Sequence, residues 1–183
     1  MKAIKYLSVI FLLLTTATSA ADFHAKGPMV ITAAGQSQDV TMVKILAQKE
    51  GLTFTFDKLA KSDQLKEHAS LVFVTGGSTK GLGAANIDKD QELNRMKALI
   101  KAAREAKMSI ITMHVGGPSR RGSLSDEFNK LSAENADCLI IVKSGNEDGF
   151  FSKMAETKKI PIFLIDKIME AGKVLNQIFA EQK

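Results

Sequence analysis

The sequence has few of the residues on which several classes of protein depend. Among its 183 residues there are one cysteine, three prolines and no tryptophan. A single cysteine cannot form an internal disulfide, which excludes a disulfide scaffold. The formal net charge of +5 falls to +3 without the two lysines of residues 1–20, and no basic run exceeds three residues, which argues against a nucleic-acid-binding protein. Hydrophobic residues make up 45% and charged residues 25%, which excludes a disordered chain.

The first twenty residues have the pattern of a secretory signal peptide. Lys2 and Lys5 precede an apolar run from Tyr6 to Leu14, and small residues follow as far as Ala21. The run is shorter than the ~20 residues that a membrane-spanning helix needs. We therefore expect residues 1–20 to be removed, which leaves a periplasmic or secreted protein that does not span the membrane. An uncleaved anchor is the alternative.

Six short apolar runs alternate with amphipathic segments along the rest of the chain. The runs are apolar at successive positions, which indicates strands covered on both faces. These predicted strands are 29–33, 52–56, 71–74, 109–113, 138–142 and 161–165. The segments between them have apolar residues at helical spacing. These predicted helices are 39–50, 58–68, 89–106, 125–134, 150–157 and 167–181.

The alternation of strand and helix implies parallel strands joined by right-handed crossovers. Residues 22–183 are predicted to form a single α/β domain. Its core is expected to be an open, doubly wound and mostly parallel sheet of five or six strands, with helices on both faces. This is a flavodoxin-like or Rossmann-like fold. The strand order 2-1-3-4-5 is favoured, with a sixth strand at the edge.

Four loops that follow predicted strands hold most of the glycines. They are residues 34–39, 75–86, 114–123 and 143–149, and they contain ten of the thirteen glycines. Ligands of open α/β sheets bind beyond the carboxyl ends of the strands. Glycine lets backbone N–H groups approach a ligand there. The sequence therefore predicts a binding site at this edge, and loops that merely turn the chain are the alternative.

Cationic side chains in the same loops favour a small anionic ligand, such as a carboxylate, a phosphate or a sulfonate. Acidic residues other than Asp39, Asp88, Glu147 and Asp148 are expected to lie elsewhere. A binding module of this kind can serve a membrane transporter. The predicted ligand-binding residues are Gln36, Ser37, Gly76, Gly77, Ser78, Lys80, Asn86, His114, Gly116, Gly117, Arg120, Arg121 and Asn146.

No cofactor is predicted from the motifs. Lys80 is followed by Gly81 rather than by Ser or Thr, so the phosphate-loop spacing is absent. The loop after the first strand lacks the glycine fingerprint of dinucleotide-binding domains. His114 has no second His or Cys at ligand spacing, so no metal site is predicted.

Gly35-Gln36-Ser37, directly after the first strand, resembles the nucleophile block of the SGNH-type and sialate-esterase-like hydrolases. The resemblance implies a flavodoxin-like sheet, with Ser37 as nucleophile and Asn86 or the Gly76-Gly77 backbone as oxyanion donors. It covers only the residues around Ser37. The Asp-x-x-His pair of that family is missing, which leaves His114 as the base. An exported serine esterase is therefore the alternative function.

The chain as a whole resembles the small exported single-domain α/β proteins of bacteria that have no assigned function. This second resemblance implies no activity. A protein-interaction module is a further alternative, and it would show an exposed apolar patch instead of a pocket.

Overall fold

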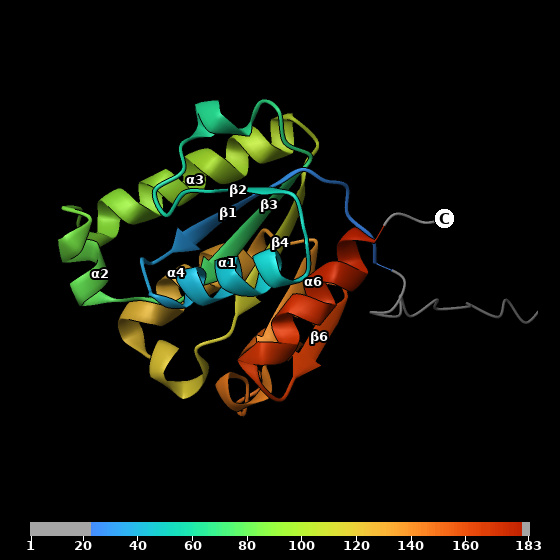
Figure 1. The fold of residues 1–183 in the computed structure, drawn as a ribbon. Coiled ribbons are helices and arrows are strands. Elements are labelled where there is room, and N and C mark those ends of the chain that lie inside the picture. Colours follow the sequence, from blue (N-terminus) through green and yellow to red (C-terminus); the bar gives the residue numbers. More distant parts are fainter. Residues whose placement is uncertain (1–22, 181–183) are drawn as a thin grey trace, which may run out of the picture.

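The computed structural model describes residues 23–180, so the predicted signal peptide lies outside the described residues. Six parallel strands form one sheet in the order β2-β1-β3-β4-β5-β6 (Figure 1). This order confirms the flavodoxin-like prediction, with the sixth strand at the edge. The strands are β1 (Met29–Ala34), β2 (Phe54–Phe56), β3 (Ser70–Thr75), β4 (Ser109–His114), β5 (Cys138–Val142) and β6 (Ile162–Ile165).

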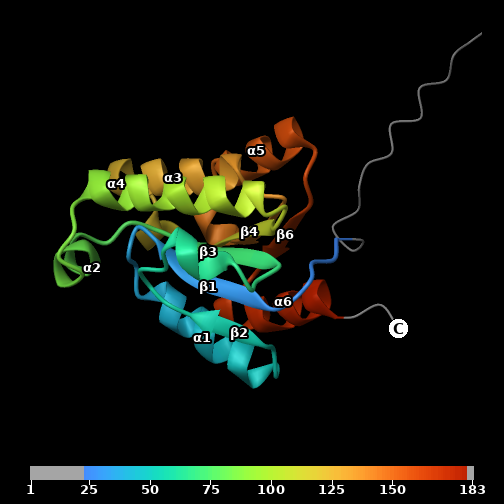
Figure 2. The ribbon, with the colours of Figure 1, turned by 90° about the horizontal axis from the view of Figure 1, so that it is seen from above.

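Helices cover both faces of the sheet. Figure 2 shows α1 and α6 on one face, and α3, α4 and α5 on the other. None of the helices in residues 23–180 is both long and apolar enough to cross a membrane. The α-helices are α1 (Asp39–Lys49), α2 (Thr79–Ala84), α3 (Lys89–Glu105), α4 (Ser123–Glu134), α5 (Phe150–Lys158) and α6 (Ala171–Phe179). Short 3₁₀ turns are η2 (Ser62–Leu65), η3 (Gly117–Arg120), η4 (Lys143–Gly145) and η5 (Ile168–Glu170).

The apolar runs of the strands are explained by burial on both sides of the sheet. Successive side chains of a strand point to opposite faces. In β1, Ile31 therefore packs in the cluster with α1 and α6, whereas Val30 packs in the cluster with α3 and α4. Both residues are 0% exposed. A strand covered on one side only would have shown polar residues at alternate positions.

Two expectations about local structure are wrong. Residues 58–68 form only the 3₁₀ turn η2 instead of a helix, because three apolar residues do not supply a helical stripe. The loop over residues 75–86 contains the helix α2, although its two glycines disfavour helix formation. Ser78 caps α2, since its Oγ accepts a hydrogen bond from the Gly81 N–H at 3.0 Å.

Candidate functional site

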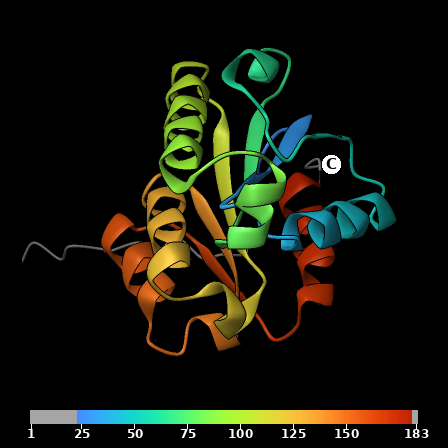
Figure 3. The same cartoon turned by 90° about the vertical axis from the view of Figure 1, so that its left-hand side faces the viewer.

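The loops that follow β1, β3 and β4 meet beyond the carboxyl ends of these strands. We call this side of the sheet the carboxyl edge. The Ser78 N–H donates to the Gly35 oxygen at 2.9 Å, and Gln36 forms an isolated antiparallel bridge with Gly77. α2 follows directly and packs on the β1 loop, near the start of α1 (Figure 3). Glycine-rich backbone at this edge therefore packs against backbone of a neighbouring loop.

Arg120 reaches across this edge from the β4 loop to the first residue of α1. Its Nε donates to Oδ2 of Asp39 at 3.0 Å, and the Ser37 hydroxyl donates to the same oxygen at 3.0 Å. The Arg120 stem passes over Gly76 and Gly116, where a Cβ atom would overlap it. These two glycines therefore make room for the protein's own arginine.

The outer side of this ion pair faces solvent. The Arg120 side chain is 26% exposed and the Asp39 side chain 19%. Within residues 23–180, neither Nη atom of Arg120 forms a hydrogen bond, and neither does Oδ1 of Asp39. Ser37, by contrast, is only 1% exposed. The pair thus keeps free donors and one free acceptor at the carboxyl edge, while Ser37 holds it from beneath.

A buried ion pair fixes the β1 loop. Glu92 of α3 is 0% exposed and accepts hydrogen bonds from the Gly35 N–H at 2.9 Å and from Nε2 of Gln36 at 3.0 Å. Its other oxygen accepts from Nε of Arg95 at 2.8 Å. Arg95 also donates to the backbone oxygen of Ala60 at 3.0 Å. Gln36, a predicted ligand-binding residue, therefore points inward, with a left-handed φ of 61°.

Arg121 joins the β4 loop to the β5 loop. It donates to Asp126 and Asp148, each at 2.8 Å at the shortest contact, and to the Gly145 oxygen at 2.7 Å. Its guanidinium lies 4.5 Å from the ring centre of Phe150. The hydrogen bond from Arg121 lowers the pKa of Asp148, and the same bond raises the pKa of Arg121. Arg121 is therefore engaged inside the protein.

The expectation about acidic residues at this edge is wrong. Asp126 pairs with Arg121, and Asp166 pairs with Lys143 at 2.8 Å. A shallow hollow of about 270 Å³ beside Arg121 is lined by Asp126, Glu147 and Asp148 among others. Most cations of the four loops are therefore neutralised by carboxylates, and two of these lie outside the loops, Asp126 in α4 and Asp166 after β6.

The structure does not join Ser37 to His114, the two residues of the predicted esterase. Ser37 donates to Asp39, whereas Nε2 of His114 lies 3.2 Å from the Gly117 oxygen. The imidazole is 0% exposed and lies 4.8 Å, centre to centre, from the Phe151 ring. β3 lies between β1, which precedes Ser37 in the chain, and β4, which ends at His114. The hydroxyl therefore has a carboxylate rather than an imidazole as its hydrogen-bond acceptor.

Burial of His114 predicts a stability that falls in mild acid. Burial lowers the pKa of His114 below 6.5, and Nδ1 is buried without a partner among the described residues. Arg121 lowers this pKa further, whereas the Gly117 oxygen, Asn129 and Asp39 raise it. The unfolded chain therefore takes up the proton first as the pH falls. The stability that neutral His114 contributes is fully present above the pKa of this histidine in the unfolded chain. It is lost as the pH falls from that value toward the lower pKa of His114 in the folded protein.

Urea unfolding at pH 7.5 and pH 5.5 measures this effect. We expect His114→Phe to show a smaller loss of stability between the two pH values than the wild type. His24→Ala, a change at an exposed histidine, serves as the control and should keep the wild-type loss. Equal losses of stability between the two pH values in the wild type and in His114→Phe would contradict the assignment of this pH dependence to His114.

Several other predicted ligand-binding residues have local structural roles. Asn86 lies two residues after the last residue of α2, in the left-handed conformation with φ of 54° that commonly ends a helix. Oδ1 of Asn146 accepts the Phe151 N–H at 2.8 Å at the start of α5. The Gly77 N–H donates to Oγ of Ser125 at 3.0 Å. Lys80 is exposed and forms no ion pair with any residue from 23 to 180.

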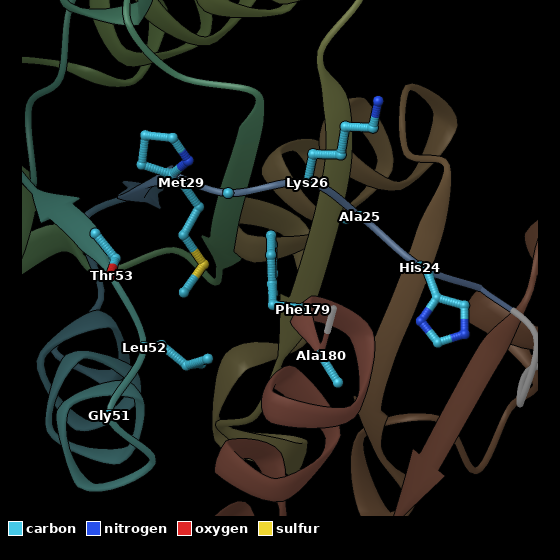
Figure 4. A pocket seen from close by; sticks show the side chains of 11 residues that line it. His24, Ala25, Lys26, Met29, Gly51, Leu52, Thr53, Phe179 and Ala180 are labelled. Carbon is cyan, nitrogen blue, oxygen red and sulfur yellow. The ribbon is translucent and has the colours of Figure 1, made fainter. Parts of the chain in front are cut away.

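A hollow larger than the one beside Arg121 lies at the opposite edge of the sheet. It has a volume of about 1000 Å³ and lies between Leu52, Met29 and Phe179 (Figure 4). Nothing in the sequence patterns predicted it, because its walls come from the N-terminal segment, the loop before β2 and the end of α6. Within the described part of the chain, no three His, Cys, Asp or Glu residues are grouped to hold a metal ion.

The chain has distant similarity to solved hydrolase structures. A GDSL-like lipase from Bacteroides thetaiotaomicron is 14% identical, with a TM-score of 0.35 over 74% of this chain and 66% of the lipase. This chain thus spans just under two thirds of the lipase. The esterase AlinE4 is 10% identical, with a TM-score of 0.31 over 88% of this chain and 85% of the esterase. Neither likeness indicates what this chain does.

Sequence comparison gives the family without an activity. No curated protein matches the chain. Residues 26–179 match the family described as "Domain of unknown function (DUF6305)". This match covers nearly all of the described residues, including every strand and every α-helix. The chain therefore belongs to the DUF6305 family.

Proposed function

We propose that this domain binds a small molecule through an anionic group at the Arg120–Asp39 pair. The observation that carries the proposal is the guanidinium of Arg120, whose two Nη groups have no partner among the described residues. Arginine meets planar oxyanions with two parallel hydrogen bonds, which suits these free groups. The place also supports the proposal, because ligands of such sheets bind where the strand order reverses, here between β1 and β3.

Other cationic side chains of the carboxyl edge are weaker candidates for binding the anionic group of the ligand. Arg121 and Lys143 already pair with carboxylates, and His114 is buried. Lys80 is exposed and adds positive charge at the start of α2. We therefore assign recognition to Arg120, with Lys80 as a second, solvated cation.

Thermal unfolding in the presence of acetate, inorganic phosphate and methanesulfonate tests the proposal. We expect at least one of these anions to raise the unfolding temperature of the wild type at millimolar concentration. Arg120→Ala should remove that shift, because the free donors are lost. Arg104→Ala is the matched control, since Arg104 also pairs with an aspartate, Asp137, at 2.8 Å but at the other end of the molecule. Equal shifts in all three proteins would contradict the proposal.

We propose further that the protein works outside the cytoplasm, in the periplasm or after secretion, and can serve a membrane transporter. The support is the signal-peptide pattern of residues 1–20. Cell fractionation followed by N-terminal sequencing tests it. The mature chain is expected in the periplasm or medium and to begin at Ala21 or Asp22. A cytoplasmic chain that begins at Met1 would contradict it.

Serine esterase activity is not expected from this geometry. The Ser37 hydroxyl is 1% exposed and is bonded to Asp39. A serine without a base is a weak nucleophile. Hydrolysis of p-nitrophenyl acetate should therefore proceed at the same rate with the wild type and with Ser37→Ala. A rate that falls to background in the variant would restore the esterase alternative.

A further inference from the structure

The Asp39–Arg120 pair presents two opposite charges next to each other at the proposed site. Oδ2 of Asp39 accepts from both Ser37 and Arg120, each at 3.0 Å. Oδ1 of Asp39 and both Nη groups of Arg120 make no hydrogen bond within residues 23–180. A charged acceptor and charged donors therefore adjoin at the same partly exposed place.

This pair is more firmly held than an ordinary surface ion pair. Its side chains are 19% and 26% exposed, whereas those of the Lys89–Glu127 pair are 41% and 47% exposed. Buried Ser37 holds the carboxylate, and the missing side chains of Gly76 and Gly116 let the Arg120 stem lie against backbone. The free atoms thus stay in place without a ligand, which lowers the entropy lost on binding.

The charge balance of the pair indicates the class of ligand. A ligand with only negative charge would be attracted by Arg120 and repelled by Asp39 in the same place. A ligand with a carboxylate and an ammonium close together would be attracted by both residues. We infer that the site takes a zwitterionic α-amino acid, an inference that rests on the proposed function. The ligand carboxylate accepts from Nη1 and Nη2 of Arg120, and its ammonium donates to Oδ1 of Asp39.

Isothermal titration calorimetry with matched ligands tests this inference. The standard α-amino acids are titrated first, and each one that binds is compared with its analogue lacking the amino group and its analogue lacking the carboxylate. For L-alanine these analogues are propionate and ethylamine. A hydrogen bond between charged groups changes affinity by roughly ten-fold or more. We therefore expect the amino acid to bind at least ten-fold more tightly than either analogue.

Two variants separate the roles of the residues. Asp39→Asn should remove the preference for the amino acid over its deamino analogue but keep binding of the carboxylate. Arg120→Ala should abolish binding of both ligands, and Arg120→Lys, which keeps the charge, should restore part of it. Urea unfolding of each variant shows that it is folded before titration. Arg104→Ala, which breaks the exposed Arg104–Asp137 pair at the far end of the molecule, should bind these ligands like the wild type.

The outcomes distinguish this inference from the proposed function. If the deamino carboxylate binds as tightly as the amino acid, and Asp39→Asn changes nothing, the ligand class is wrong while anion binding at Arg120 stands. If amino acids and carboxylates fail to bind but inorganic phosphate or methanesulfonate binds at Arg120, only the inference is overturned. If none of these ligands binds, or if all bind equally well to Arg120→Ala, both the inference and the proposed function are overturned.

Discussion

Glu92→Ala is expected to lower the free energy of unfolding by about 3–5 kcal/mol, because it leaves the mostly buried guanidinium of Arg95, whose side chain is 13% exposed, without its carboxylate partner. Glu92 is 0% exposed, and its ion pair with Arg95 has an N–O distance of 2.8 Å. The variant also leaves the buried Gly35 N–H without its side-chain acceptor and removes one of the two acceptors of the Gln36 amide, the other being the Lys58 oxygen, and buried donors without acceptors are costly. The change therefore removes three partners at once.

Urea unfolding measures this loss. Glu127→Ala is the control, since Glu127 pairs with Lys89 on the surface and its side chain is 47% exposed. Its unfolding midpoint should stay close to that of the wild type. A loss in Glu92→Ala no larger than that in Glu127→Ala would show that the buried pair does not stabilise the loop.

Gly81→Ala is expected to destabilise the protein by about 1–3 kcal/mol or more through overpacking. A Cβ atom at Gly81 would overlap the backbone oxygen of Gln36. Backbone cannot move aside as the end of a long side chain does, so either α2 or the β1 loop must shift. The shift reaches Ser37 and hence the Arg120–Asp39 pair. We therefore expect the variant to lose ligand binding as well as stability.

The same helix provides the matched control. A Cβ atom at Gly83 meets nothing within 4 Å, and the position is helical. Gly83→Ala should therefore stabilise the protein by about 0.5–1 kcal/mol, the usual gain for alanine over glycine in a helix. Thermal and urea unfolding of the two variants should give changes of opposite sign. Changes of the same sign and size would contradict the packing of α2 on the β1 loop.

The fold was predictable because burial on both faces leaves a clear pattern in the sequence. In β5, all five residues from Cys138 to Val142 are apolar and buried, as a central parallel strand requires. The strand order was a choice of the flavodoxin-like order among several doubly wound ones, and the observed order agrees with it. The helix α2 was missed because two of its six residues are glycines, and its stability comes from packing on a loop that is distant in sequence.

The site was predictable in place but not in its contacts. The loops after β1, β3 and β4 do meet, as their glycines indicated. Glu92 and Arg95 were missed because a charged pair three residues apart in a helix usually lies on the surface. Only the tertiary structure shows that Glu92 is buried. Likewise, no local pattern indicates that Asp126 reaches Arg121 or that Asp39 reaches Arg120.

These differences change the chemistry expected at the carboxyl edge. A set of loop cations suggested a general anion site, whereas the structure pairs most of them with carboxylates. Within residues 23–180, what remains is exposed Lys80 and one arginine with free donors next to one carboxylate with a free oxygen. Binding at the carboxyl edge therefore depends on that pair, and the larger hollow near Met29 at the opposite edge is the competing binding site.

Residue-resolved NMR of the ¹⁵N-labelled protein decides between these two places. The spectrum is recorded during titration with the α-amino acid that binds best in calorimetry, or with acetate if none binds. We expect shifts of the backbone amides of Ser37, Asp39, Gly76, Gly116 and Arg120, and none at Met29, Leu52 and Phe179. Shifts confined to the second group, or no shifts at saturating millimolar concentration, would contradict binding at the carboxyl edge.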